Sequence, residues 1–528
     1  MKRKISLMIV LVSALLALIG VFGYEQYTKE KIKLPTVYAS VWDIADPGDY
    51  WVTVPALENR ALSCDINGIS FEGDSTIYLL MPEDVDETEV VYYLRDPYNN
   101  FMARVVSDFR EEVVIGEKQI KLVKSKLPVM FIETAEEFGS FSDLLKSETK
   151  EANCYGDLYL SVSRENAKKN AWAEEFISED YDEKVPQSMS LHPRGNMTWA
   201  GGRKKPFALR LEHAEDLLGM GKNKKWNLIA NSQDKSLMKN EMFYQMAEEI
   251  GLAYTPLAEN VSLYVDGNYQ GVYLLTTKIS VDKNRVNLKK GDFLVNWGAP
   301  NAVQKLTYTS DRWEPDSVTV PSYAELVWPE NDTDTAWKQE FLQKLVTAIE
   351  DTGNDDYLEY LDIESMVKYY WVQEISLNSD AFYRSAYAYY KKDTGKLYMG
   401  PVWDMDMSNG SILTKEDIPF NTPEGWKIRE CGWYAALFEH EGFREAAGKA
   451  YFEDGIRDEM YQLLEDMEQE KKRLSVDGEL NYRLWTSEII QYSLQYDVSS
   501  YEAHTDKEIE FYKRRIDWID EQMQKEDW

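Results

Sequence analysis

The segment GPVWDMDMSNG, residues 400–410, places two carboxylates, Asp404 and Asp406, after an apolar run and before a glycine. Carboxylate oxygens are ligands that Mg²⁺ and Mn²⁺ prefer in proteins, commonly together with phosphate oxygens. The same pattern is typical of a polar turn that follows a buried strand. The choice between a metal site and a turn therefore depends on the residues around this segment.

A second acidic cluster is expected close to the first. Apolar spacing predicts a helix over residues 362–378, which leads directly to Asn378 and Asp380. The run SAYAYYKKDTGKLYMGPVW then predicts a β-hairpin that turns near residues 393–395 and ends at Asp404. Because a hairpin brings the chain back to where it began, we expect Asp380 and Asp404 to lie near each other.

Cations upstream of these acids could face phosphate groups; they are Arg194, Lys204, Lys205 and Arg210. Phosphoryl transfer needs a metal-binding acid, an acid that orients the acceptor hydroxyl and a cation on the phosphate chain. Spacing alone leaves two other interpretations open. The carboxylates could be polar turn residues, or they could form the acid pair of a glycosidase.

The N-terminus carries a targeting pattern. Three basic residues, numbers 2–4, precede the uncharged stretch Ile5 to Tyr24, which is long enough to cross a bilayer. The basic flank predicts that the rest of the chain lies outside the cytoplasm. We favour an uncleaved signal anchor over residues 1–24, followed by a polar tether over residues 25–33, with a cleaved signal peptide as the alternative.

The composition excludes several classes of function. The 528 residues carry a formal net charge of −33, which argues against nucleic acid and anionic lipid surfaces as partners. The chain has 4 His and 3 Cys, and their spacing fits neither a zinc site nor a Ser-His-Asp triad. Aromatic residues make up 13% of the chain, which is typical of a folded protein.

The pattern along the chain predicts three regions. Residues 34–130 are rich in strand-like runs and predict a small β-sandwich module, and residues 131–190 are interpreted as a connection. Residues 191–528 form the third region, which becomes mainly helical from about residue 337. Within it, a methionine stripe predicts a core-packed amphipathic helix over residues 236–251, and Asp266-Gly267 predicts the turn of a hairpin over residues 261–276.

Five blocks in this third region resemble, in order, those of the spore-coat CotH kinase family. They are RGNMTW…KKPFALRL, LLGMGKNKKWNLIANSQDKSLMKN, YVDGNYQGVYLLT, EISLNSD and MGPVWDMD. The resemblance covers roughly residues 191–410 and implies an α+β, atypical protein kinase-like fold. It also implies use of ATP and a divalent metal, Mg²⁺ or Mn²⁺, to phosphorylate Ser or Thr of envelope or coat proteins.

The resemblance implies a role for individual acids. Asp404 matches the metal-binding aspartate, and Asp406 matches the second acid of that motif. Asp380 matches the catalytic-loop aspartate that orients the acceptor hydroxyl, and Asn378 would hold that loop.

The resemblance also implies a nucleotide-binding set: Arg194, Asn196, Lys204, Lys205 and Arg210. Each of these residues also has a structural interpretation, such as a salt bridge for Arg194 or a solvated position for Lys204. Asn231 and Asp234 match a further polar block without an assigned role, and they could equally cap the helix that begins near Ser236.

Two departures from the family pattern keep a second hypothesis open. Thr277 stands where the family commonly has Glu, and Met405 stands where an aromatic residue is common. We therefore expect either a membrane-anchored, extracytoplasmic CotH-like kinase or a catalytically weak protein of the same fold that serves envelope assembly or adhesion. A glycan-active extracellular protein is a third interpretation.

Overall fold

The computed structural model describes residues 36–38, 41–42, 50–59, 62–96, 98–135, 137, 139–163, 185–298, 302–312, 323–381, 384–409, 422–485, 499–526 and 528. The predicted signal anchor and tether lie outside these ranges. Within them, every helix is too short or too polar to cross a membrane.

The chain forms two compact units, Met1–Val123 and Lys124–Trp528. The sequence placed the end of the first module near residue 130, close to this boundary. The predicted connection over 131–190 is corrected by the structure, because strands of the second unit lie within it. Residues 129–132 pair with residues 262–265, far along the chain, and local pattern does not reveal such long-range pairing.

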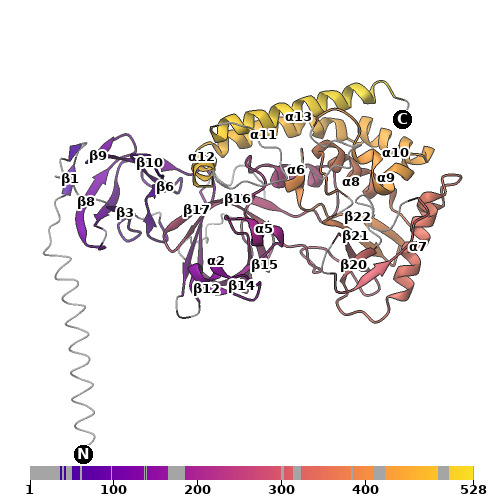
Figure 1. Ribbon diagram of the computed structural model, residues 1–528, viewed down its shortest axis with the longest axis horizontal. Coiled ribbons are helices and arrows are strands. Elements are labelled where there is room, and N and C mark those ends of the chain that lie inside the picture. Colours follow the sequence, from indigo (N-terminus) through magenta and orange to yellow (C-terminus); the bar gives the residue numbers. More distant parts are fainter. Residues whose placement is uncertain are drawn as a thin grey trace, which may run out of the picture. The chain divides into compact units, whose positions relative to one another are not determined.

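Within its described residues, the first unit contains two five-stranded sheets, which confirms a β-rich module (Figure 1). Gly68 lies where an added Cβ would approach Val52 of one sheet and Ile77 and Leu79 of the other, so the two sheets come close together at this residue. In sheet order, the strands are β1 (Thr36–Tyr38), β8 (Phe101–Ser107), β7 (Val90–Arg95), β3 (Trp51–Val54) and β4 (Ile66–Asn67), then β2 (Val41–Trp42), β9 (Val113–Ile115), β10 (Lys118–Lys124), β6 (Thr76–Met81) and β5 (Ile69–Ser70).

The second unit begins with a closed seven-stranded barrel. Apolar side chains that alternate along the strands, such as Leu209, Trp226 and Leu275, fill its interior. Neighbouring strands are antiparallel except β11 and β16, which are parallel. In barrel order, the strands are β11 (Val129–Thr134), β12 (Cys154–Ser161), β13 (Gln187–Pro193), β14 (Phe207–Glu215), β15 (Asn223–Ile229), β17 (Asn268–Thr277) and β16 (Ala258–Val265).

A five-stranded sheet in the second unit carries the hairpin that leads to Asp404. The hairpin consists of β21 (Ala386–Lys391) and β22 (Lys396–Met399), as the sequence predicted. The sheet continues through β18 (Phe293–Trp297), β20 (Tyr323–Trp328) and β19 (Lys305–Thr307). Apolar residues of this sheet, including Phe293 and Trp297, share one large core with the helices that follow.

The helices confirm the mainly helical character predicted for the later part of the chain, and Figure 1 shows α13 running alongside α11. Met238, Met242 and Met246 are buried, which confirms the packing role of the methionine stripe. The helices are α2 (Phe141–Lys146), α5 (Met197–Gly201), α6 (Lys239–Glu249), α7 (Ala336–Glu350), α8 (Ile363–Ser376), α9 (Gly432–Leu437), α10 (Glu441–Phe452), α11 (Ile456–Arg473), α12 (Ser475–Leu484) and α13 (Tyr501–Met523), with short 3-10 turns η2 (Asp356–Glu359), η3 (Met405–Met407) and η4 (Ile428–Glu430).

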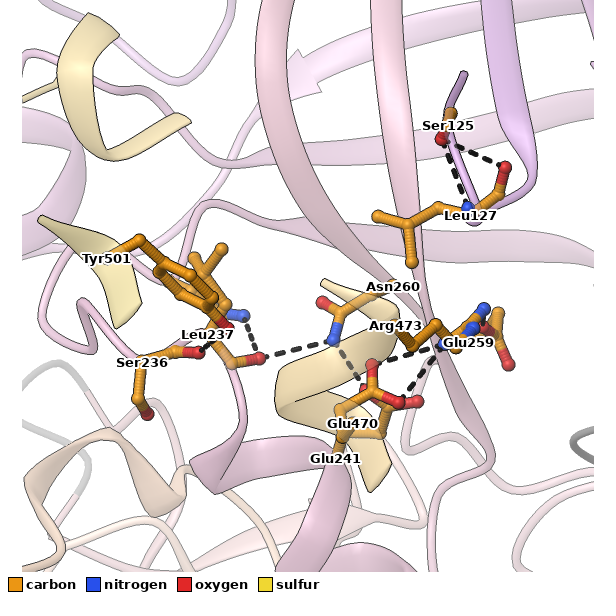
Figure 2. Close-up of polar contacts among 11 residues, drawn as sticks. Ser125, Leu127, Ser236, Leu237, Glu241, Glu259, Asn260, Glu470, Arg473 and Tyr501 are labelled. Carbon is orange, nitrogen blue, oxygen red and sulfur yellow. Dashed lines mark hydrogen bonds and ion pairs between the residues drawn. The ribbon is translucent and has the colours of Figure 1, made fainter. Parts of the chain in front are cut away.

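A buried polar network fastens helix α6 to the barrel (Figure 2). Asn260 of β16 donates hydrogen bonds to Glu241 of α6 and, over 3.2 Å, to the carbonyl of Leu237. On the same strand, Glu259 accepts a hydrogen bond from Arg473 at the end of α11. Because the carboxylates of Glu241 and Glu259 are buried and hydrogen-bonded, the network fixes where α6 begins.

Asp477 of α12 is a buried carboxylate that should make stability depend on pH. It is fully buried, and it accepts hydrogen bonds from the hydroxyls of Ser125, over 2.6 Å, and Ser262. Burial raises its pKa to about 6, although these hydrogen bonds oppose the shift. The folded chain therefore holds this proton at a pH where the unfolded chain has lost it, and stability falls as the pH rises through that window.

The Asp477→Asn variant should lack this dependence, since its side chain stays neutral. Between about pH 5 and pH 7.5, the free energy of unfolding of the wild type should fall relative to that of the variant by roughly 1.5 kcal/mol. Urea unfolding of both proteins across this range measures the difference. If the free energies of unfolding of the two proteins change with pH in parallel, the raised pKa of Asp477 is contradicted.

Candidate functional site

Asp404 lies just beyond β22, at the start of the 3-10 turn η3, and groups from helix α6 and from the hairpin hold it. Its backbone N–H donates to the Tyr244 hydroxyl over 3.2 Å, and the next N–H, of Met405, donates to Asn240 Oδ1 over 2.9 Å. The hydroxyl of Ser385, which precedes β21, donates to Asp404 Oδ2 over 2.8 Å. The carboxylate is therefore oriented by groups from α6 and from the hairpin.

Left-handed backbone conformations gather around this carboxylate. Asp404 has φ 62°, and Leu377, Ser385 and Asn409 have φ of 52°, 53° and 50°. Such values are uncommon for residues other than glycine and persist where the surrounding structure enforces them. Their concentration within the two loops that carry the acids indicates a site shaped for a purpose other than stability.

Asp380 lies in the loop after α8, with only 7% of its surface exposed. Its backbone N–H donates to Asn378 Oδ1 over 3.1 Å, so Asn378 holds the loop as expected. Within the described residues, Asp380 Oδ1 is buried without a hydrogen-bond partner. Burial raises the pKa of Asp380 to about 6, the charge of Asp404 adds to the shift, and Arg384 opposes it. Asn378 Nδ2 donates to the Asp404 carbonyl over 3.5 Å, and the Ser379 N–H donates to the Met407 carbonyl over 3.4 Å, so the loops that carry Asp380 and Asp404 lie side by side as predicted.

Asp406 is more deeply enclosed than Asp404. It accepts a hydrogen bond from the side-chain amide of Asn240. Burial raises its pKa to about 7, and Asp404 raises it further, while Asn240 and Lys239 act in the opposite direction. A cation placed next to this acid would favour its ionised form.

Arg194 is the one member of the predicted nucleotide-binding set that the structure brings to the acids. Its guanidinium lies 5.6 Å from the ring centroid of Trp403, which stacks on Tyr244 at 6.0 Å. Burial lowers the pKa of Arg194, and the charges of Asp404 and Asp406 counteract that shift. The half-buried guanidinium therefore sits within electrostatic reach of both carboxylates.

Two lysines that the sequence analysis missed carry positive charge into the same region. Lys278 follows β17, and burial lowers its pKa, with further lowering from Lys225 and Arg194. Lys225 of β15 lies opposite Arg210 of β14 in the antiparallel ladder. On the other side of β15, Lys278, which directly follows β17, occupies the position next to Lys225. This row of cations, Arg210, Lys225 and Lys278, was detectable only from the strand register.

The other predicted cofactor residues make local contacts. Lys204 is 2% exposed and donates over 2.8 Å to Asn481 Oδ1 of α12. Lys205 donates to the carbonyl of Trp199, and Asn196 accepts from Lys150 over 2.5 Å. Their role in binding a nucleotide stays a prediction.

Asp234 caps helix α6. Its Oδ2 accepts from the backbone N–H of Lys239 over 2.9 Å, and its Oδ1 accepts from that of Ser236 over 2.9 Å. Asn231 donates to the carbonyl of Leu237 over 3.4 Å. Asp234 thus satisfies the first N–H of α6, although the N-cap position itself is Met238 and makes no side-chain cap hydrogen bond. Asn231 bonds to a carbonyl and does not cap the helix, so the capping prediction is confirmed for Asp234 alone.

The acids fit a divalent cation that completes its shell with phosphate oxygens. Among the described residues, His, Cys, Asp and Glu side chains form no cluster of three or more that could hold a metal by themselves. Mg²⁺ is commonly bound through one or two carboxylates plus substrate phosphates. Asp404 and Asp406 supply such a pair, and the unpartnered Oδ1 of Asp380 offers an acceptor beside them.

Comparison with known proteins places this site in a family. The sequence model described as CotH kinase protein matches residues 191–519, more than half of the chain, and the match contains every acid of the site. It begins within β13, so β11 and β12 of the barrel precede it. A search of curated proteins gave no match. The family match, the α+β architecture and the paired acids agree, and the chain belongs to the CotH kinase family.

Proposed function

We propose that the chain is a CotH-type protein kinase that transfers the γ-phosphate of ATP to Ser or Thr of envelope or coat proteins, with Mg²⁺ or Mn²⁺. The observation that carries this proposal is the meeting of Asp380 and Asp404, from separate loops, with one oxygen of Asp380 buried and unpartnered. Family membership supports the reaction class, since the matched family is one of kinases.

The three acids would have different roles in phosphoryl transfer. Asp404, together with Asp406, would hold the divalent cation, which neutralises charge on the phosphates when bound. Asp380 would orient the acceptor hydroxyl through Oδ1 and take its proton as the oxygen–phosphorus bond forms and the bond to ADP breaks. Because burial raises the pKa of Asp380 to about 6, this carboxylate is a stronger base than an ordinary aspartate.

Positive charge is available for the phosphate chain. Arg194 faces the carboxylates, and Lys278 lies close enough to Arg194 for its pKa to be lowered by that charge. Arg194 already has Asp404 and Asp406 near it, whereas Lys278 is repelled by Lys225 and Arg194, and bound phosphate groups would relieve that repulsion. This supports a polyphosphate as the ligand, with Arg194 and Lys278 in contact with it.

The setting that we propose is extracytoplasmic. The uncharged stretch over residues 5–24 and its basic flank support a single-pass anchor with the kinase unit outside the membrane. A protein substrate in the envelope or coat would then be within reach of the tethered kinase.

One observation favours a second candidate, an envelope assembly or adhesion protein that retains the fold with weak nucleotide binding. Thr277 is buried, and its hydroxyl accepts from the backbone N–H of Leu257 over 3.1 Å. It therefore supplies no charge at a position where the resemblance led us to expect a glutamate.

Phosphate transfer by the wild type separates these candidates, and the Asp380→Asn variant tests the role of Asp380. With γ-labelled ATP and Mn²⁺, the full chain should label Ser or Thr on itself or on casein, and the variant should do so about 10²- to 10⁴-fold more slowly. Its affinity for the Mn²⁺–ATP complex should change by less than about twofold, because Asn has the same shape and only the base is lost. The exposed Asp393→Asn in the hairpin turn is the matched control.

Phosphate transfer that persists in Asp380→Asn would contradict the role of this residue. A wild-type chain that binds Mn²⁺–ATP without transferring phosphate to either acceptor would favour the assembly protein.

A further inference from the structure

Two side chains of α6, Asn240 and Tyr244, bind the turn that carries the metal-binding acids. The Tyr244 hydroxyl accepts the N–H of Asp404 over 3.2 Å and donates to Asn240 Oδ1 over 3.2 Å. Asn240 Oδ1 also accepts the N–H of Met405 over 2.9 Å. Being four residues apart, Asn240 and Tyr244 project from the same face of the helix.

The hydrogen bonds of Asn240 fix its orientation. Its oxygen accepts two hydrogen bonds, and its nitrogen donates two, to Asp406 Oδ1 and, over 3.2 Å, to Asn231 Oδ1. An amide has two acceptor and two donor positions, so all of its capacity is used. Asn240 is fully buried, and its side-chain amide is therefore not expected to flip.

We infer that Asn240 and Tyr244 are positioning residues that hold Asp404 in its left-handed conformation before the cation binds. This inference rests on the proposed function. With φ 62°, Asp404 occupies a conformation that an aspartate leaves readily unless neighbouring groups retain it. Tyr244 accepts a hydrogen bond from the N–H of Asp404, and Asn240 accepts one from the N–H of Met405. The carboxylate of Asp404 therefore needs no rearrangement to receive the cation.

The helix that carries the two side chains is itself fixed. Asp234 caps its first turn, and the network in Figure 2 joins Glu241 and Leu237 to Asn260 of the barrel. Lys239 Nζ donates over 3.1 Å to the carbonyl of Ser408, on the far side of the turn. Helix α6 therefore binds both ends of η3, and contacts with the barrel fix the position of α6.

The Tyr244→Phe variant removes one hydroxyl and keeps the ring that stacks on Trp403. In the full chain, hydrogen exchange in the segment 400–409 should become at least about fivefold faster, and the affinity for Mn²⁺ with ATP should fall by about fivefold. The control is Tyr434→Phe, which removes a buried hydroxyl donating over 3.2 Å to the carbonyl of Met366. It should lower stability to a similar degree and leave both readouts unchanged.

Each outcome decides the inference. Faster exchange with weaker binding in Tyr244→Phe alone would establish it. If the wild type binds Mn²⁺–ATP and Tyr244→Phe matches it in affinity or in exchange, the positioning role is overturned and the proposed function stands. If the wild type binds neither Mn²⁺ nor Mn²⁺–ATP, both claims fall together.

Discussion

The Asp404→Asn variant is expected to lose phosphoryl transfer by at least about 10³-fold, because the cation that neutralises the phosphate charge would lose its principal protein ligand. Folding should be little affected. Asp404 is half-buried, Asn has nearly the same shape, and the backbone N–H contact to Tyr244 does not involve the altered atoms. The large effect on rate should therefore come with a small effect on the free energy of unfolding.

Labelled phosphate transfer and urea unfolding measure the two quantities on the same preparation. Asp393→Asn, an exposed aspartate in the turn of the same hairpin, changes the charge equally and should behave as the wild type in both. If Asp404→Asn retains more than about a tenth of the wild-type rate, Asp404 is not the principal metal ligand.

The Arg515→Met variant is expected to destabilise the second unit by about 3–5 kcal/mol. Arg515 of α13 and Glu374 of α8 form an ion pair whose side chains are both 0% exposed. Arg515 also donates to the carbonyls of Pro423, over 2.9 Å, and Gly425, over 2.6 Å. Removing the guanidinium would leave a buried charge and several carbonyls without their donor.

The neighbouring Arg514 provides a matched control. It pairs with Glu424 at 2.5 Å, but the two side chains are 55% and 46% exposed, so Arg514→Met should cost less than about 1 kcal/mol. Adding Glu374→Gln to Arg515→Met should recover part of the loss, since the buried charge is then removed. Equal losses in the two single variants, measured by urea unfolding, would contradict the account.

This ion pair also affects the site. Glu374 lies two residues before the end of α8, and its carboxylate accepts the backbone N–H groups of Lys427, over 2.9 Å, and Arg429, over 2.8 Å. The helix end that delivers the chain to Asp380 is thus fastened to the C-terminal region.

Local pattern was sufficient to predict the elements that carry the acids. The hairpin around residues 393–395 and the helix ending near residue 378 follow from alternation and helical spacing, and both place their acids as expected. The methionine stripe of α6 was predictable for the same reason, because burial of one helix face leaves a periodic trace.

Long-range geometry was not predictable in the same way. Lys204 could have been a solvated cation as far as local pattern shows, but it is buried against Asn481, which lies far along the chain. Lys278 joins Lys225 only because β15 and β17 are neighbours in the barrel. Asn240 and Tyr244 lie within a helix whose apolar stripe explains its sequence, so nothing local marked them as partners of Asp404.

The central claim is that Asp404 binds a nucleotide through a divalent cation, and thermal unfolding of the full chain tests it most directly. With ATP and Mn²⁺ at about 100 times the dissociation constant, the wild type should gain about 2.7 kcal/mol of stability. The account predicts that this gain requires the metal and disappears in Asp404→Ala. An equal gain in Asp404→Ala, or no gain in a well-folded wild type, would contradict it.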